Sequence, residues 1–103
     1  MARSATETTR RIVALVEGDR RKILSLGRAA SSASLLHDLV TRELVFAIPE
    51  AARRTSLSEV TIGKAAAHLE KLGIVREATG RSRNRLYVYS EYLRVLQAEP
   101  DLA

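Results

Sequence analysis

Residues 58–89, SEVTIGKAAAHLEKLGIVREATGRSRNRLYVY, decide the fold of this chain. Ser58 is a residue type that caps helices by accepting a hydrogen bond from a free backbone N–H of the first turn, and Glu59 suits the positive end of the helix dipole. Gly73 is typical of the position just after a helix, where the backbone turns left-handed. The stretch therefore predicts a helix over residues 58–72.

One side of this helix is apolar and the other is open to a partner. Placed at 100° per residue, the apolar side gathers the residues that we expect to pack inward, which are Ile62, Ala65, Ala66, Leu69 and Leu72. The opposite side holds Val60, Lys64, Ala67 and Lys71, with Gly63, Thr61 and His68 at its borders. Short side chains and lysines on the open side allow a polyanion to approach closely.

Two short strands follow this helix. Residues 74–76, which begin with the β-branched Ile74 and Val75, predict the first strand, and residues 86–89 predict its antiparallel partner. The loop between them, ATGRSRNR, is too polar to pack and has turn-forming residues, Gly80 and Asn84. It also holds three arginines, Arg81, Arg83 and Arg85. On the second strand the tyrosines, Tyr87 and Tyr89, should share one half-buried face, which we favour over a role in base stacking.

The residues before this stretch complete a helix-turn-helix. A short amphipathic helix is expected at residues 35–40, capped by Ser32 or Ser34, and residues 43–48 predict a strand that could join the same sheet. Pro49 begins the next helix, which ends near Thr55, because proline is tolerated at the first helical position. This order predicts a mainly α fold with a small antiparallel β wing, which is a winged helix-turn-helix.

The N-terminal part predicts a long helical arm with a thin apolar seam. The seam consists of Ile12, Leu15, Val16, Ile23 and Leu26. Asp19 interrupts it where another apolar residue is expected, and Gly18 weakens the helix by about 1 kcal/mol relative to alanine. The arm therefore needs another surface, which is the rest of the domain, a second copy of the chain or a larger protein. We expect a homodimer through the arm.

Small residues at 27–34, GRAASSAS, predict a break after the arm. We therefore expect an arm and linker at residues 1–30 and a winged-helix domain at residues 31–103. A helix capped by Ser90 should follow the second wing strand, and the final residues, AEPDLA, should be frayed.

The composition indicates an acidic partner. The formal net charge of the 103-residue chain is +5. Residues 53–85 hold eight Lys or Arg and three acids, so the whole excess falls in the predicted helix-turn-helix and wing. Such a distribution favours duplex DNA as partner over an incidental basic surface.

Several classes of protein are excluded or disfavoured. The sequence has no cysteine, so it forms no disulfide or thiolate metal site, and no apolar run of membrane-spanning length. We expect a cytoplasmic protein without a membrane segment. His37 and His68 stand on different predicted helices without an acidic cluster, and no phosphate-binding or nucleophile motif occurs. No catalytic residue, metal or cofactor is expected, and His37 should be a surface or packing residue.

The stretch from Ala51 to Leu96 resembles the C-terminal winged-helix region of Fic-domain proteins, the filamentation-induced-by-cAMP family. The resemblance is densest at Ser58, Thr61, LEKLGI around Gly73, TGR at 79–81, Asn84 with Arg85, and YSEYL at 89–93. It extends to the arm and linker. Enzymes of this family transfer AMP from ATP to protein hydroxyls through a motif H-x-F-x-x-G-N-G-R, which this chain lacks.

Two functions follow from the residues and the resemblance. The first is a DNA-binding module of the transcription-regulator type, in which helix 58–72 enters the major groove and wing 79–85 holds the backbone. Its expected contact residues are Ser58, Thr61, Lys64, His68, Lys71, Arg81, Arg83, Asn84 and Arg85. The alternative is a module for dimerisation or protein interaction that positions a Fic catalytic domain, because winged helices serve both purposes.

Overall fold

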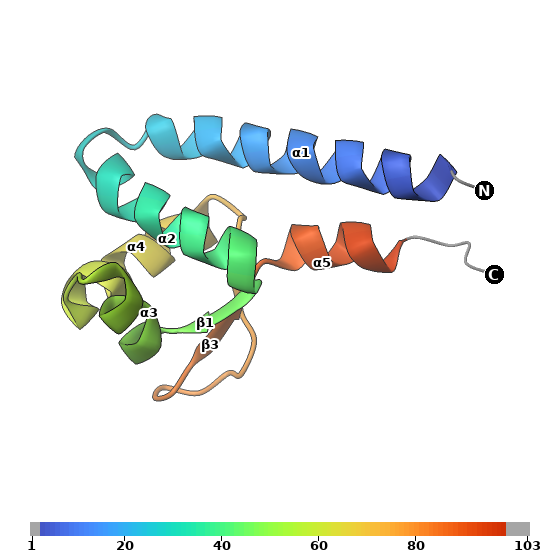
Figure 1. Ribbon diagram of the computed structural model, residues 1–103. Helices are drawn as coiled ribbons and strands as arrows, with labels where there is room; N and C mark the ends of the chain where they lie inside the picture. Colours follow the sequence, from blue (N-terminus) through green and yellow to red (C-terminus); the bar gives the residue numbers. More distant parts are fainter. Residues whose placement is uncertain (1–2, 99–103) are drawn as a thin grey trace.

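The computed structural model describes residues 3–98, and most of them are helical (Figure 1). Its elements are α1 (Arg3–Leu24), η1 (Gly27–Ala29), α2 (Ala30–Glu43), β1 (Val45–Ala47), α3 (Ile48–Thr55), α4 (Glu59–Lys71), β2 (Arg76–Glu77), β3 (Leu86–Val88) and α5 (Ser90–Gln97). Of the final residues expected to fray, 99–103 lie outside this described range.

The three strands form one antiparallel sheet in the order β1-β3-β2. β1 pairs with β3 through Val45 and Val88, which confirms that the strand expected at residues 43–48 joins the sheet. The first strand of the hairpin begins later than predicted. Ile74 and Val75 are buried, and their N–H groups donate to the Leu69 carbonyl, so they close α4 instead of extending the strand.

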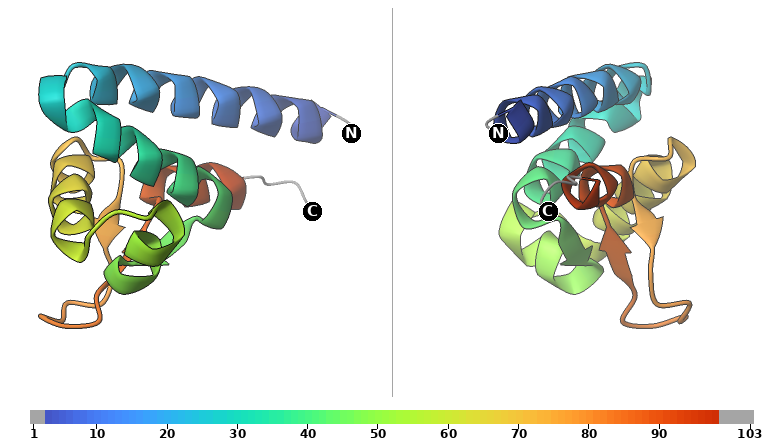
Figure 2. Two further views of the ribbon diagram at one scale, coloured as in Figure 1. Left: turned by 60° about the vertical axis from the view of Figure 1, so that its left-hand side comes forward. Right: turned by 90° about the vertical axis from the view of Figure 1, so that its right-hand side faces the viewer.

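The core lies between α2, α3, α4 and the sheet (Figure 2). The inward side of α4 is as predicted, since Ile62, Ala65, Ala66 and Leu69 are buried. Pro49 stands in the first turn of α3, as expected. Tyr87 and Tyr89 are both buried, where the sequence predicts a half-buried face. Tyr87 stacks on Phe46, whereas Tyr89, which follows β3, lies against His37 and Tyr92.

The region expected to be a break after the arm is helical instead. Gly27, with φ of +71°, turns the chain, η1 follows, and α2 begins at Ala30. Ser32 and Ser34 therefore lie inside α2, and neither caps it, because the N-cap is Ala29. Small residues form a helix instead of a linker when they can pack in the core. Ala33 is such a residue, since it is fully buried.

The arm helix α1 lies along α2 and α5 (Figure 1). Ile23 is fully buried, and Leu15 and Leu26 pack against the core. Ile12 and Val16, nearer the N-terminus, are only half-buried. The C-terminal half of the arm therefore packs against the rest of the domain. This is one of the three surfaces that the sequence analysis considers for the apolar seam.

The last helix, α5, starts at Ser90, but this serine does not cap it. The N-cap position is Tyr89, and it makes no side-chain capping hydrogen bond. No residue of α5 is fully buried, although Tyr92 packs against the core. The helix thus covers one side of α1 without entering the centre of the molecule.

Candidate nucleic-acid interface

The open face of α4 is exposed as the sequence predicts. Val60 is 68% exposed, and Lys64, Ala67 and Lys71 are exposed as well. Thr61 and His68, at the border of this face, are half-buried. The helix therefore offers a strip with two ammonium groups and two apolar side chains.

The start of α4 is held by a hydroxyl pair. The Oγ of Ser58 accepts a 3.0 Å hydrogen bond from the N–H of Thr61 and donates a 3.0 Å hydrogen bond to the Thr61 Oγ1. This confirms Ser58 as the N-cap. The pair commits the O–H donor of Ser58 to the helix cap, whereas the Thr61 hydroxyl only accepts in it, and its own O–H makes no hydrogen bond within residues 3–98.

The β2–β3 loop, residues 78–85, is built on the carboxylate of Glu77. Its Oε2 accepts hydrogen bonds from the N–H of Thr79 at 2.8 Å, from the N–H of Gly80 at 2.7 Å, and from the Thr79 hydroxyl. The hydrogen bond from the Thr79 side chain is the main cause that lowers the pKa of Glu77 below its usual 4.5. Gly80 and Asn84 have positive φ, +68° and +52°, and form the turns, as predicted.

The three arginines of this loop are not equivalent. Arg85 donates from Nε to the Arg81 carbonyl at 2.5 Å, and a hydrogen bond to the Tyr87 side chain raises the pKa of its guanidinium. The side chains of Arg81 and Arg83 make no such contacts within residues 3–98 and are exposed. Arg85 therefore stabilises the loop, whereas Arg81 and Arg83 are available to a ligand.

A hollow of about 510 Å³ separates the loop from the start of α4. It is lined by residues of α3, α4, β3 and the β2–β3 loop, which are Ile48, Pro49, Glu59, Ser82, Arg83, Asn84, Arg85 and Tyr87. It brings three of the predicted contact residues, Arg83, Asn84 and Arg85, to the N-terminal end of α4. His68 and Lys71 lie near the other end of the helix, so the structure does not gather all nine predicted residues in one place.

Part of the positive charge counted in the sequence is neutralised by ion pairs. Arg53 pairs with Glu50 within α3, and Arg54 pairs with Glu43 of α2 at 3.3 Å. These two arginines belong to the surface of α3. The remaining positive charge of residues 53–85 is therefore concentrated on α4 and the hairpin.

A buried polar cluster, which the sequence analysis missed, joins the arm to the body. The hydroxyl of Tyr89 donates to the Asp19 carboxylate at 2.6 Å, and the Nε2 of His37 lies 3.1 Å from the same hydroxyl. All three side chains are buried. Because the tyrosine hydrogen points to Asp19, His37 must donate its Nε2–H to the tyrosine oxygen.

Burial governs the protonation of this cluster. It lowers the pKa of His37, against the opposing charges of Asp19 and Asp38, and it raises the pKa of Tyr89 together with the hydrogen bond to Asp19. His37 is therefore a packing residue, as expected. The signal in the sequence was Asp19, a polar residue at an inward position, which requires a buried partner.

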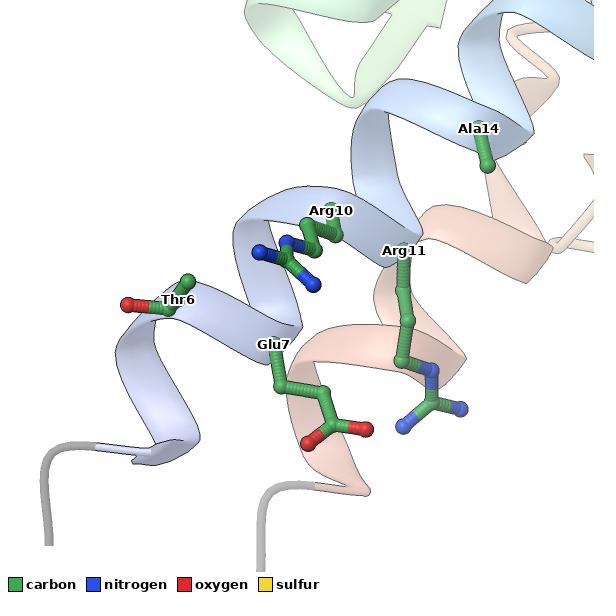
Figure 3. Close-up of a pocket in the computed structure, with 5 residues that line it drawn as sticks. All are labelled: Thr6, Glu7, Arg10, Arg11 and Ala14. Carbon is green, nitrogen blue, oxygen red and sulfur yellow. The ribbon is translucent and has the colours of Figure 1, made fainter.

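A second hollow of about 420 Å³ runs along the surface of α1. Its lining residues, Thr6, Glu7, Arg10, Arg11 and Ala14, all come from that one helix, and Glu7 and Arg11 extend from the same side (Figure 3). Within residues 3–98 no cluster of three potential metal-binding side chains occurs, and no helix is long and apolar enough to cross a membrane.

Comparison with models of protein families, with curated protein sequences and with solved structures gives no significant match for this chain.

Proposed function

We propose that this chain is a winged-helix module that binds duplex DNA, with α4 in the major groove and the β2–β3 loop as the wing. The observation that carries the proposal is the hollow between them, which is lined both by Arg83 of the loop and by Glu59 in the first turn of α4. A recognition helix and a wing that flank one groove can hold a DNA backbone between them.

The order of elements supports this assignment. Helix α2, strand β1, helices α3 and α4, and the hairpin β2–β3 follow each other as a helix-turn-helix with a β wing does. The resemblance of residues 51–96 to the C-terminal region of Fic-domain proteins favours an accessory or transcription-regulating role. Without the AMP-transfer motif, this chain should transfer no label from ATP to protein.

The side chains of the loop and of α4 suit different kinds of contact with DNA. Arg81 and Arg83 are exposed on a polar loop and suit phosphate contacts, which add affinity without sequence information. Lys64 and Lys71 reach the groove or its edge, whereas Val60 and Ala67 offer at most apolar contact to a thymine methyl. Arg85 contributes mainly by holding the loop.

A salt titration of binding to random-sequence duplex DNA tests the proposal. If about five phosphates are neutralised, the logarithm of the binding constant falls against the logarithm of salt with a slope near −4.5, which is about −0.9 for each phosphate. Replacing Arg81 and Arg83 together by alanine should reduce the steepness by about two and weaken all duplexes alike.

The matched control is Arg53→Ala, which removes an arginine that is paired with Glu50 on α3 and should leave the slope unchanged. Absence of duplex binding at low salt, or an unchanged slope in the double arginine variant, contradicts the proposal. In that case the alternative applies, a protein-interaction module that positions a Fic-type catalytic domain.

We also propose that the arm forms a homodimer contact. The half-buried Ile12 and Val16 of α1 are not among the residues that pack against the core. Two copies related by a two-fold axis would bury these residues against each other. The dimer would present two copies of α4 to one duplex.

A further inference from the structure

Glu59 is an acidic residue at the centre of the proposed DNA-binding surface. It is the first residue of α4, it is exposed, and it lines the same hollow as Arg83 and Asn84. Its carboxylate makes no hydrogen bond and no ion pair within the described part of the chain, residues 3–98. A free carboxylate is unusual on a surface that is otherwise suited to phosphate groups.

The position of Glu59 restricts what it can contact in a complex. A carboxylate is repelled by the DNA backbone, so it is tolerated in a protein–DNA interface only where a base presents an amino group. In helix-turn-helix proteins the N-terminal residues of the recognition helix contact base edges. Cytosine offers its N4 amino group in the major groove, and acidic side chains accept a hydrogen bond from it.

The neighbours of Glu59 in the first turn of α4 offer no carboxylate or amide group to a base edge at the hollow. The Ser58 hydroxyl donates to Thr61 in the helix cap, and Thr61 is half-buried and does not line the hollow. Val60 has no polar atoms in its side chain, and Gly63 faces Ile48, 3.9 Å from the position a Cβ would take. Of the residues of α4, Glu59 is thus the one that lines the hollow, and its carboxylate is free to accept a hydrogen bond there.

We propose that Glu59 determines sequence preference, by accepting a hydrogen bond from the N4 amino group of a cytosine in the major groove. This inference rests on the proposed DNA-binding function. The repulsion between Glu59 and phosphates also lowers affinity for DNA in which no cytosine lies at that position, so the same residue rejects incorrect sites.

Selection of duplexes from a randomised pool, followed by affinity measurements on the selected site, tests the proposal. The wild-type chain should select a cytosine at one position and lose about ten-fold or more in affinity when that base pair is exchanged. Glu59→Gln should shift the preference at that position toward adenine, which a glutamine contacts through N6 and N7. Glu59→Ala should abolish the preference and strengthen binding to random duplex.

Glu70→Ala is the matched control, because Glu70 is an exposed acid near the other end of α4. It should leave the base preference unchanged. If Glu59 served only to stabilise the helix dipole, Glu59→Ala would change the urea midpoint of unfolding but not the selected DNA sequence. The inference is overturned if Glu59→Ala keeps the wild-type preference, or if the wild type binds duplex DNA without any preference. Absence of all duplex binding at low salt would instead overturn the proposed function itself.

Discussion

The hydroxyl of Tyr89 donates a 2.6 Å hydrogen bond to the carboxylate of Asp19, although 70 residues separate them in the sequence. Asp19 belongs to the arm, and Tyr89 stands between β3 and α5. The Nζ of Lys22 lies 3.5 Å from the other carboxylate oxygen of Asp19, Oδ1. A buried polar contact therefore connects the arm to the hairpin, and it stabilises one arrangement of α1 on the body.

Tyr89→Phe should lower the free energy of unfolding by about 2 kcal/mol, because the Asp19 carboxylate stays buried without its hydroxyl donor and His37 loses its acceptor. Urea denaturation at pH 7 measures the change. Tyr92→Phe is the matched control, since this half-buried hydroxyl has no hydrogen-bond partner in residues 3–98, and it should cost under about 0.5 kcal/mol. Equal losses in the two variants would contradict the role of the Tyr89 hydroxyl.

The stability of the fold should decrease as the pH falls below about 6.5. Burial lowers the pKa of His37 from its usual 6.5, so the unfolded chain binds a proton at a pH where the folded chain does not. Stability is then fully present above the unfolded pKa and is lost as the pH falls through the lower, folded pKa. Urea midpoints measured from pH 7.5 to 5.5 test this before most carboxylates titrate.

His37→Gln should flatten this pH dependence, whereas His68→Gln, which changes the half-buried histidine of α4, should leave it in place. A wild-type midpoint that stays constant between pH 7.5 and 5.5 would show that His37 is not kept neutral by the fold.

Glu77→Ala should increase the amide hydrogen exchange of Thr79 and Gly80, since both N–H groups donate to the Glu77 carboxylate. Exchange measured by nuclear magnetic resonance at pH 7 gives the rates residue by residue. The N–H of Ala78 is an internal control, because it donates to the Leu86 carbonyl at 2.8 Å instead. Unchanged rates at Thr79 and Gly80 would mean that Glu77 does not hold the loop.

Two glycines should respond to alanine in opposite directions. Gly18→Ala should raise the free energy of unfolding by about 1 kcal/mol, because alanine favours the helix α1 and the added Cβ meets no atom within 4 Å. Gly73→Ala should lower it by about 1 kcal/mol, because Gly73 has φ of +81°. Its Cβ also meets no atom within 4 Å, so the difference is one of backbone conformation. Thermal denaturation checks both, and shifts in the same direction would contradict the prediction.

Ile12→Ser combined with Val16→Ser should convert a dimer into a monomer in analytical ultracentrifugation, because these half-buried residues form the proposed contact between copies. The two substitutions should leave the fold of the monomer intact. Ile23→Ser is the contrasting variant, since Ile23 is fully buried in the body and its loss should destabilise the monomer itself. A wild-type chain that sediments as a monomer at all concentrations would rule out the arm dimer.

Local sequence is sufficient to predict α4 and its two faces. Ser58 and Gly73 mark the ends of the helix through local backbone chemistry, and the spacing of Ile62 and Leu69 identifies the buried side. The hairpin could be predicted for the same reason, since alternation along residues 86–89 separates Tyr87 and Tyr89 from their neighbours. Capping, turns and periodicity depend on residues within one or two turns of each other.

Tertiary structure alone decided what each buried face meets. The seam of the arm indicated a partner surface, and only packing on α2 and α5 assigned its C-terminal half to the body. Asp19, His37 and Tyr89 meet across separations of 52 and 70 residues, which no periodicity reports. The same holds for Glu59 and Arg83, which line one hollow although 24 residues separate them in the sequence. A pattern shows that a side chain is buried or exposed, but the position of its partner depends on how the whole chain packs.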